Sequence, residues 1–240
     1  MSAITLNNVT LGYGAQAAVS GVSGAFAAGK TTVIVGPNGS GKSTLLKALA
    51  GVQPVQSGRI DWAGLKRRQI AYLPQDPGMD RSFPITVADL IALGFERRLG
   101  LFGGFGAAER FDLAAAIEAV GLDGLEHRAI DALSGGQFQR ALFARVMAQD
   151  APLILLDEPF AAQDTRTTAD LLKVIQRWRG EGRTLVIVLH DLAMAWILSD
   201  ETLVMAREAV AWGPTEGVLT PGHLKRAHDV SERWAMEDAA

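Results

Sequence analysis

The stretch GPNGSGKST at residues 36–44 constrains the fold more than any other, because it joins the apolar run TTVIV to the amphipathic segment KSTLLKALAG. Glycines allow the tight backbone turns that let successive N–H groups surround an anion. The spacing G-x-x-x-x-G-K-[ST] between a buried strand and a helix is typical of a phosphate-binding loop. The sequence therefore predicts an α/β protein with a nucleotide phosphate site at the end of a strand.

The loop residues have distinct expected roles. Lys42 is expected to reach the β and γ phosphate oxygens of the nucleotide, and the hydroxyl of Ser43 is expected to be a ligand for Mg²⁺. The full set expected to contact the nucleotide is Gly36, Pro37, Asn38, Gly39, Ser40, Gly41, Lys42, Ser43 and Thr44.

Two further apolar runs, PLILLDEP and RTLVIVLHD, suit strands that are buried on both faces of a parallel sheet. Parallel strands end at one edge, so the residues after them meet the phosphate loop there. We expect Asp157 to bind Mg²⁺ and Glu158 to act as the general base that polarises the attacking water. His190 is able to hydrogen-bond to both a γ-phosphate oxygen and a catalytic carboxylate. The competing interpretations are an acidic helix cap for the carboxylates and an ordinary loop position for His190.

Two residues outside these runs are also candidates. Gln75 in YLPQD follows a predicted strand, where its amide would touch Mg²⁺ or the attacking water; the alternative is an ordinary loop residue. Tyr13 lies between glycines, so its ring either stacks on a purine or packs near a turn. The remaining histidines, His127, His223 and His228, are expected to be solvated rather than ligands.

The pattern of elements changes along the chain. The segment ITLNNVTLGYG alternates in the manner of an edge strand, and GRIDWAG and RRQIAYLPQ are expected strands. Between Pro84 and about Asp150 the strand signal disappears, and apolar residues recur about every 3.6 positions, which predicts a helical insert. Its middle, Leu99 to Gly106, is glycine-rich and either a loose linker or a docking surface that presents Leu101 and Phe102.

Composition excludes several classes of protein. The 240 residues contain 23 Lys and Arg against 26 Asp and Glu, so no basic excess indicates nucleic acid as a partner. There is no cysteine, which excludes disulfides and thiolate metal sites. The start of the chain lacks the features of a signal peptide, and the apolar runs are far shorter than the roughly 20 residues of a membrane helix. We expect a cytoplasmic protein that reaches a membrane only through a partner.

The stretch LSGGQFQR at residues 133–140 places a serine and two glycines at the start of a helical run. Backbone N–H groups at a helix N-terminus bind phosphate. The chain already has a complete phosphate loop of its own. The phosphate that binds at this second site is therefore expected to belong to a nucleotide that is held by a different phosphate loop.

Tyr13, GPNGSGKST, YLPQD, LSGGQFQR, LILLDEP and VLHD together resemble the ATP-binding cassette (ABC) ATPases, in the order and spacing of that family across nearly the whole chain. The resemblance implies one domain over 1–240. Its core, 1–84 with 151–240, is a P-loop NTPase fold with a mostly parallel sheet and an N-terminal antiparallel β subdomain. Residues 85–150 form an inserted α-helical subdomain that carries the signature.

The resemblance also implies that two cassettes close head to tail on two ATPs. Each signature then holds the γ-phosphate bound by the other copy, through Ser134, Gly135, Gly136 and Gln137. The segment AAQD at residues 161–164 resembles the family's dimer-contacting loop; Asp164 keeps that role, whereas Gln163 replaces the usual apolar residue.

A single cassette of this size resembles an importer subunit. DRSFPITVADLIALG, followed by LGLF, and the tail LVMAREAVAWGPTEGVLT resemble the ATPases of manganese and zinc uptake systems; siderophore and cobalamin importers are the alternative. The implied partners are membrane permease subunits, a second copy of the chain and, indirectly, a substrate-binding protein, with the chain peripheral on the cytoplasmic face of the inner membrane. A soluble ABC ATPase acting on ribosomes or DNA would carry a second cassette, a coiled coil or basic extensions, and a nucleotide sensor would not need Glu158 and His190.

Overall fold

The computed structural model describes residues 4–14, 16–76, 78–99, 105–161 and 163–238. No helix within these ranges has both the length and the apolar character needed to cross a membrane.

A six-stranded sheet forms the centre of the molecule, in the order β5-β6-β7-β3-β8-β9. Its strands are β3 (Thr31–Val35), β5 (Ile70–Leu73), β6 (Leu153–Asp157), β7 (Thr184–Val188), β8 (Glu201–Ala206) and β9 (Glu208–Pro214). All neighbouring pairs are parallel except β8 and β9. The predicted mostly parallel sheet is therefore confirmed, and the carboxyl ends of β3, β6 and β7 lie at the same edge.

A second, antiparallel sheet has the order β2-β1-β4. It contains β1 (Ile4–Tyr13), β2 (Gln16–Phe26) and β4 (Ser57–Asp61). The expectation that the first strand is an edge strand is wrong, because β1 pairs with β2 on one side and β4 on the other. The sequence of β2, QAAVSGVSGAF, is rich in Ala, Gly and Ser, which are weak strand formers, so nothing in it indicated a partner for β1.

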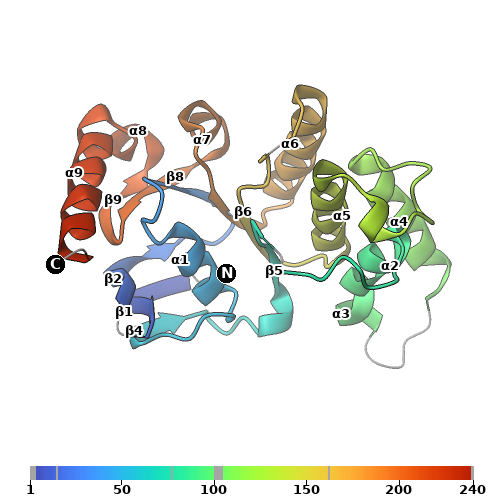
Figure 1. The fold of residues 1–240 in the computed structure, drawn as a ribbon, viewed down its shortest axis with the longest axis horizontal. Helices are drawn as coiled ribbons and strands as arrows, with labels where there is room; N and C mark the ends of the chain where they lie inside the picture. Colours follow the sequence, from blue (N-terminus) through green and yellow to red (C-terminus); the bar gives the residue numbers. More distant parts are fainter. Residues whose placement is uncertain (1–3, 15, 77, 100–104, 162, 239–240) are drawn as a thin grey trace.

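Helix α1 (Lys42–Leu49) follows the phosphate loop and packs between the two sheets (Figure 1). Its leucines share a hydrophobic cluster with β1, β2 and one face of the central sheet, which contributes Ile34. Val33 and Val35 point to the opposite face and join a second cluster. Burial of β3 on both faces explains why its last three residues, Val33 to Val35, are all apolar.

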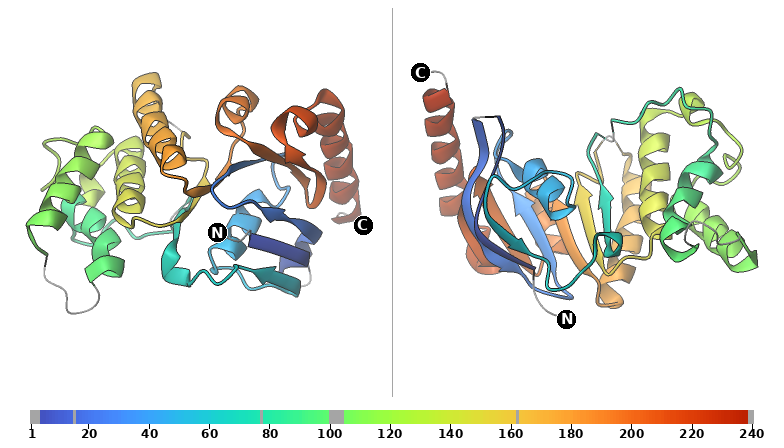
Figure 2. Two further views of the ribbon diagram at one scale, coloured as in Figure 1. Left: turned by 180° about the vertical axis from the view of Figure 1, so that it is seen from behind. Right: turned by 90° about the horizontal axis from the view of Figure 1, so that it is seen from below.

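The described elements between β5 and β6 are all helical and occupy one end of the molecule, opposite α9 (Figures 1 and 2). They are α2 (Val87–Ala92), η2 (Leu93–Phe95), α3 (Glu96–Leu99), α4 (Ala107–Ala119), η3 (Ile130–Ala132) and α5 (Gly135–Ala148). The remaining helices are η1 (Arg67–Gln69), α6 (Thr165–Gly180), α7 (Leu192–Leu198), α8 (Thr215–Val218) and α9 (Pro221–Asp238).

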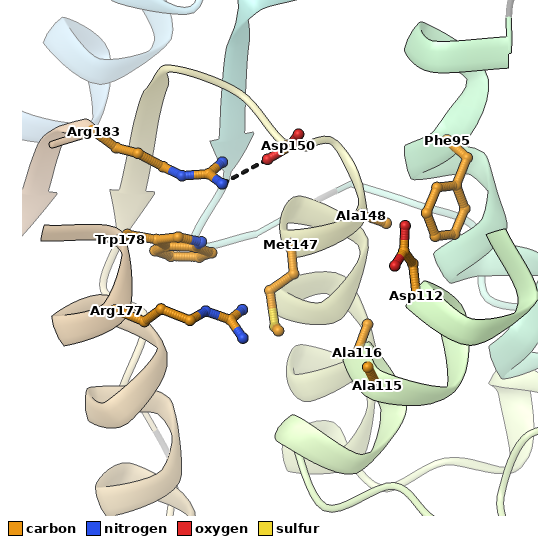
Figure 3. A pocket seen from close by; sticks show the side chains of 10 residues that line it. All are labelled: Phe95, Asp112, Ala115, Ala116, Met147, Ala148, Asp150, Arg177, Trp178 and Arg183. Carbon is orange, nitrogen blue, oxygen red and sulfur yellow. Dashed lines mark hydrogen bonds and ion pairs between the residues drawn. The ribbon is translucent and has the colours of Figure 1, made fainter. Parts of the chain in front are cut away.

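A pocket of about 290 Å³ lies where α4 and α5 face α6 (Figure 3). At its rim, Nη2 of Arg183 is 2.6 Å from Oδ1 of Asp150, and Nη1 donates to the carbonyl of Ala151 at 3.2 Å. These residues precede β6 and β7, so Arg183 ties together the loops at the amino ends of the two strands. The pocket is therefore at the opposite edge of the sheet from Asp157 and His190.

Candidate functional site

The phosphate loop requires glycine at two positions for steric reasons. Gly41 has φ 87°, and a Cβ there would lie 2.3 Å from the carbonyl oxygen of Ala18. Gly36 has φ 153°, and a Cβ there would lie 2.0 Å from the carbonyl oxygen of Met205. Strands on both sides thus hold the loop in a conformation that an L side chain would disrupt.

The side chain of Lys42 is folded into the loop. Its ammonium donates to the carbonyl oxygens of Gly36 at 2.9 Å and Pro37 at 2.7 Å. Burial lowers the pKa of Lys42, although the carboxylates of Glu158 and Asp157 oppose the shift. The loop therefore holds a cation at the place where its backbone N–H groups would surround phosphate oxygens.

Ser43 and Asp157 form an oxygen pair beside the loop. The Ser43 hydroxyl donates to Oδ1 of Asp157 at 3.0 Å, and Asp157 is only 1% exposed. Burial raises the pKa of Asp157, and the Ser43 hydrogen bond and the nearby lysines only partly counter this effect. A buried carboxylate is costly unless it meets a cation, and a hydroxyl with a carboxylate suits Mg²⁺. The two side chains therefore fit the predicted magnesium ligands.

Glu158 is held in a defined orientation at the end of β6. Its Oε2 accepts a hydrogen bond from Nε2 of Gln75 at 2.8 Å, and its Oε1 lies 2.5 Å from Nε2 of His190. The backbone at Glu158 has φ 51°, and its N–H donates to the carbonyl of Val188 at 3.2 Å. A left-handed non-glycine residue costs about 1–3 kcal/mol and is typical of functional sites. Side chains from three strand ends thus meet at one carboxylate.

One cavity of about 670 Å³ contains most of these groups. It is lined by Ala18, Asn38, Gly39, Ser40, Gly41, Lys42, Ser43, Thr44, Gln75, Glu158 and His190. Ala18 was not predicted from the sequence. It belongs to β2, and an alanine in a weak strand gives no chemical signal.

Other predicted residues do not line this cavity. Tyr13 ends β1 with 58% of its surface exposed. Ser134 and Gln137 form a capping box at the start of α5, in which Ser134 Oγ accepts from the Gln137 N–H at 3.2 Å. Asp164 caps α6 by accepting from the Thr167 N–H at 2.7 Å, and these hydrogen bonds lower its pKa. A single chain therefore assembles the loop and the strand ends but not the LSGGQ segment.

The other three histidines lie outside the cavity. His127 is exposed, and Nε2 of His228 pairs with Glu232 at 3.2 Å. His223 is half-buried, with Nδ1 2.9 Å from the carbonyl oxygen of Val218.

The fold and the cavity define a P-loop nucleotide-binding protein. The chain matches the family model described as ABC transporter over residues 19–161. It is 38% identical to the manganese transport system ATP-binding protein MntB of Listeria monocytogenes, over 93% of this chain and 95% of that protein. It is 36% identical to the zinc transport system ATP-binding protein TroB of Treponema pallidum, over 94% of this chain and 86% of that protein. The chain belongs to the ABC transporter family.

Solved structures have the same fold. An inward-facing putative metal-chelate type ABC transporter superposes with a TM-score of 0.79 at 26% identity, covering 95% of this chain and 89% of that chain. The ATP binding subunit of an ABC transporter superposes with a TM-score of 0.80 at 23% identity, over 90% and 92% of the two chains.

Proposed function

We propose that this chain is the ATP-hydrolysing subunit of an importer of divalent metal ions, manganese or zinc, and that it drives a separate membrane permease. The observation that carries the proposal is the position of Glu158, which Gln75 and His190 hold beside a complete phosphate loop. The choice of cargo follows from relatives named as manganese or zinc transport ATP-binding proteins, which match nearly the whole chain.

The residues of the cavity have different roles in ATP hydrolysis. The loop N–H groups and Lys42 bind the phosphates of ATP, while Glu158 accepts the proton of the attacking water. Gln75 and His190 each form a hydrogen bond with a different carboxylate oxygen of Glu158, so the carboxylate keeps one orientation instead of rotating. Mg²⁺ bound by Ser43 and Asp157 would neutralise charge on the β and γ oxygens.

The LSGGQ segment acts, in this proposal, on ATP bound to a second copy of the chain. Ser134 is exposed at the N-terminus of the fourteen-residue helix α5. Its hydroxyl oxygen accepts from the Gln137 N–H, so the hydroxyl proton is still available to a phosphate oxygen. Ser134 therefore donates to the partner's nucleotide while its hydroxyl oxygen still caps α5. In this proposal, Asp164 contacts the second copy at the same interface, and Tyr13 stacks on the adenine.

An apolar pocket suggests where the permease contacts the chain. It has a volume of about 330 Å³ and is lined by Met79, Asp80, Phe83, Ile85, Asp89 and Leu93. Phe83 and Leu93 are 63% and 52% exposed, which is typical of a partner surface. The predicted docking residues Leu101 and Phe102 lie outside the described residues, so their role stays a prediction. Docking would place the chain on the cytoplasmic face of the cell membrane, with the substrate-binding protein on the other side.

A second cargo class is favoured by one comparison. The putative metal-chelate type ABC transporter matches at 26% identity over nearly the whole chain. A metal chelate, such as a siderophore complex, is therefore the alternative to a free divalent ion.

Transport by the reconstituted complex tests the proposal. The chain, its permease and the substrate-binding protein are combined in vesicles, with ATP and Mg²⁺ on the side of the chain, and uptake of Mn²⁺, Zn²⁺ and a ferric chelate from the side of the binding protein is measured. We expect ATP-dependent uptake of Mn²⁺ or Zn²⁺ that Glu158→Gln abolishes. Uptake of only the chelate would favour the alternative cargo, and the absence of ATP hydrolysis in the complex would refute the proposed function.

A further inference from the structure

Two glutamine side chains hold the backbone on either side of Tyr13. Nε2 of Gln53 donates to the carbonyl oxygen of Gly12 at 2.9 Å, and Nε2 of Gln56 donates to that of Gly14 at 2.9 Å. Gly12 and Gly14 are the direct chain neighbours of Tyr13. The glutamines lie between α1 and β4, 41 and 42 positions from the carbonyls that they bind, so the fold brings them to this turn.

The glutamine side chains continue the pairing of β1 beyond the end of β4. The backbone pairing of the two strands ends at Thr10 and Ser57, and the Gln56 N–H donates to the Thr10 carbonyl at 3.0 Å. Successive carbonyls of a strand point to opposite sides, so the Gly12 carbonyl faces the same side as that of Thr10. The Gln53 amide thus supplies the donor that β4 does not provide. Since β1 pairs with β2 on its other edge up to its last residue, the turn is held on both edges.

The position of the Tyr13 ring depends on this backbone. Tyr13 is 58% exposed, so side-chain packing does little to hold the ring. Gly12 is buried, and a Cβ there would lie 2.9 Å from Oε1 of Gln56 and 2.1 Å from the carbonyl oxygen of Gln16. Glycine at this position therefore allows the close approach of both the returning strand and the glutamine.

Gln53 also connects the turn to helix α1. Its backbone N–H donates to the carbonyl oxygen of Lys47 at 3.1 Å, and the Val52 N–H donates to the same oxygen at 2.8 Å. Lys47 lies in the last turn of α1, and α1 begins at Lys42 in the phosphate loop. The backbone of Gln53 is therefore fixed to the helix that follows the phosphate loop, and its side chain is fixed to the turn that carries Tyr13.

We propose that Gln53 and Gln56 are positioning residues that hold the Tyr13 ring where it stacks on the adenine of a nucleotide bound at the phosphate loop. The inference rests on the proposed function, which places Tyr13 at the adenine. Stacking depends on the relative position of the two rings. Loss of either amide lets the turn move, which reduces the contribution of the base to binding and leaves the contribution of the phosphates intact.

Binding of ADP and of inorganic tripolyphosphate, each with Mg²⁺, tests the inference by calorimetry on the isolated chain. Only ADP carries a base, so a change confined to ADP reports on the adenine contact. Gln53→Met keeps the length of the side chain and removes the donor. We expect the affinity for ADP to fall about threefold to tenfold and that for tripolyphosphate to stay unchanged. Equal losses for the two ligands, or no loss of ADP affinity, would overturn the proposal.

Two further glutamine variants test whether the effect is general loosening of the fold. Gln56 is exposed, so Gln56→Met should leave the fold intact and still lower the affinity for ADP about twofold to threefold. Gln69→Met is the matched control, because Oε1 of Gln69 accepts from the Lys66 N–H at 3.0 Å and lies outside the cavity. The control should bind ADP like wild type. A loss as large as that of Gln53→Met would show general loosening and overturn the proposal.

The Tyr13→Ala background shows whether Gln53 acts through the ring. Tyr13→Ala should lower the affinity for ADP about tenfold, and adding Gln53→Met should lower it no further. A full additional loss in the double variant would mean that Gln53 acts by another route and would overturn the proposal. Unchanged ADP affinity in Tyr13→Ala would refute the stacking role and this proposal together. A complex that neither hydrolyses ATP nor transports would refute the proposed function and leave the binding results standing.

Discussion

Nε2 of His190 lies 2.5 Å from Oε1 of Glu158, although the two residues follow different strands and are 32 positions apart. Parallel pairing of β6 with β7 brings them together, because Asp157 is in register with Val188. A carboxylate that acts as a base only accepts hydrogen bonds, so the proposed role requires His190 to donate from Nε2 in this contact. The pair orients the proposed base.

Removal of this contact should slow turnover. In His190→Ala, we expect kcat to fall about tenfold to hundredfold, because a hydrogen bond to a charged group contributes about 1.5–3 kcal/mol. The KM for ATP should change little, since the loop residues are intact. His127→Ala, at an exposed position outside the cavity, is the matched control. An unchanged kcat in His190→Ala would contradict the orienting role.

Glu158→Gln should separate binding from chemistry. The amide keeps the shape of the side chain but no longer accepts a proton from water, so turnover should fall by about 10²- to 10⁴-fold. ATP still binds through Lys42 and the loop, so a stable ATP-dependent dimer should appear in light scattering. Adding Lys42→Ala, which removes the phosphate contacts, should abolish that dimer. Near-normal turnover in Glu158→Gln would show that another group is the base.

Asp157→Asn should stabilise the nucleotide-free chain. Burial raises the pKa of Asp157 in the fold, so the folded chain loses stability as the pH rises from the unfolded value, near 3.8, through the folded one. Asparagine does not ionise, so the variant keeps the stability that wild type loses when Asp157 becomes charged. It should therefore unfold at a higher temperature than wild type at pH 7. The difference should shrink as the pH is lowered toward 3.8.

The same variant should lose Mg²⁺-dependent stabilisation by ATP, because one of the proposed ligands no longer carries a charge. Calorimetry with ATP, with and without Mg²⁺, measures this effect. A variant that unfolds at a lower temperature than wild type at pH 7 would contradict the account of the buried charge.

Two glycines of the loop form a matched pair. A Cβ at Gly41 meets the carbonyl of Ala18 at 2.3 Å, whereas a Cβ at Gly39 meets nothing within 4 Å. Both have positive φ, so each alanine variant should lose about 1–2 kcal/mol from backbone strain. Only Gly41→Ala should also displace the loop from β2 and abolish ATP binding in equilibrium titrations. Equal affinities in the two variants would contradict the steric argument.

The sequence was sufficient where the signal is local. The loop, the buried strands and the residues directly after them are encoded in short segments, and the topology then brings Gln75, Glu158 and His190 together. The central position of β1 was missed because its partner β2 has a composition of weak strand formers. The hydrogen bonds from Arg81 to the carbonyl oxygens of Ile130 and Leu133 depend on packing between a loop and η3, and no pattern around residue 81 indicates them.

The most direct test of the central claim, that one chain's loop meets another chain's signature, uses the absence of natural cysteine. Two variants are made in the Glu158→Gln background and mixed. One carries Asn38→Cys in the phosphate loop, and the other carries Ala132→Cys at an exposed position just before LSGGQ. A short bifunctional maleimide should link the mixed chains into a dimer only when ATP and Mg²⁺ are present, and neither variant alone should be linked. Linkage within a single chain that carries both cysteines, with no ATP-dependent dimer in the mixture, would contradict the account.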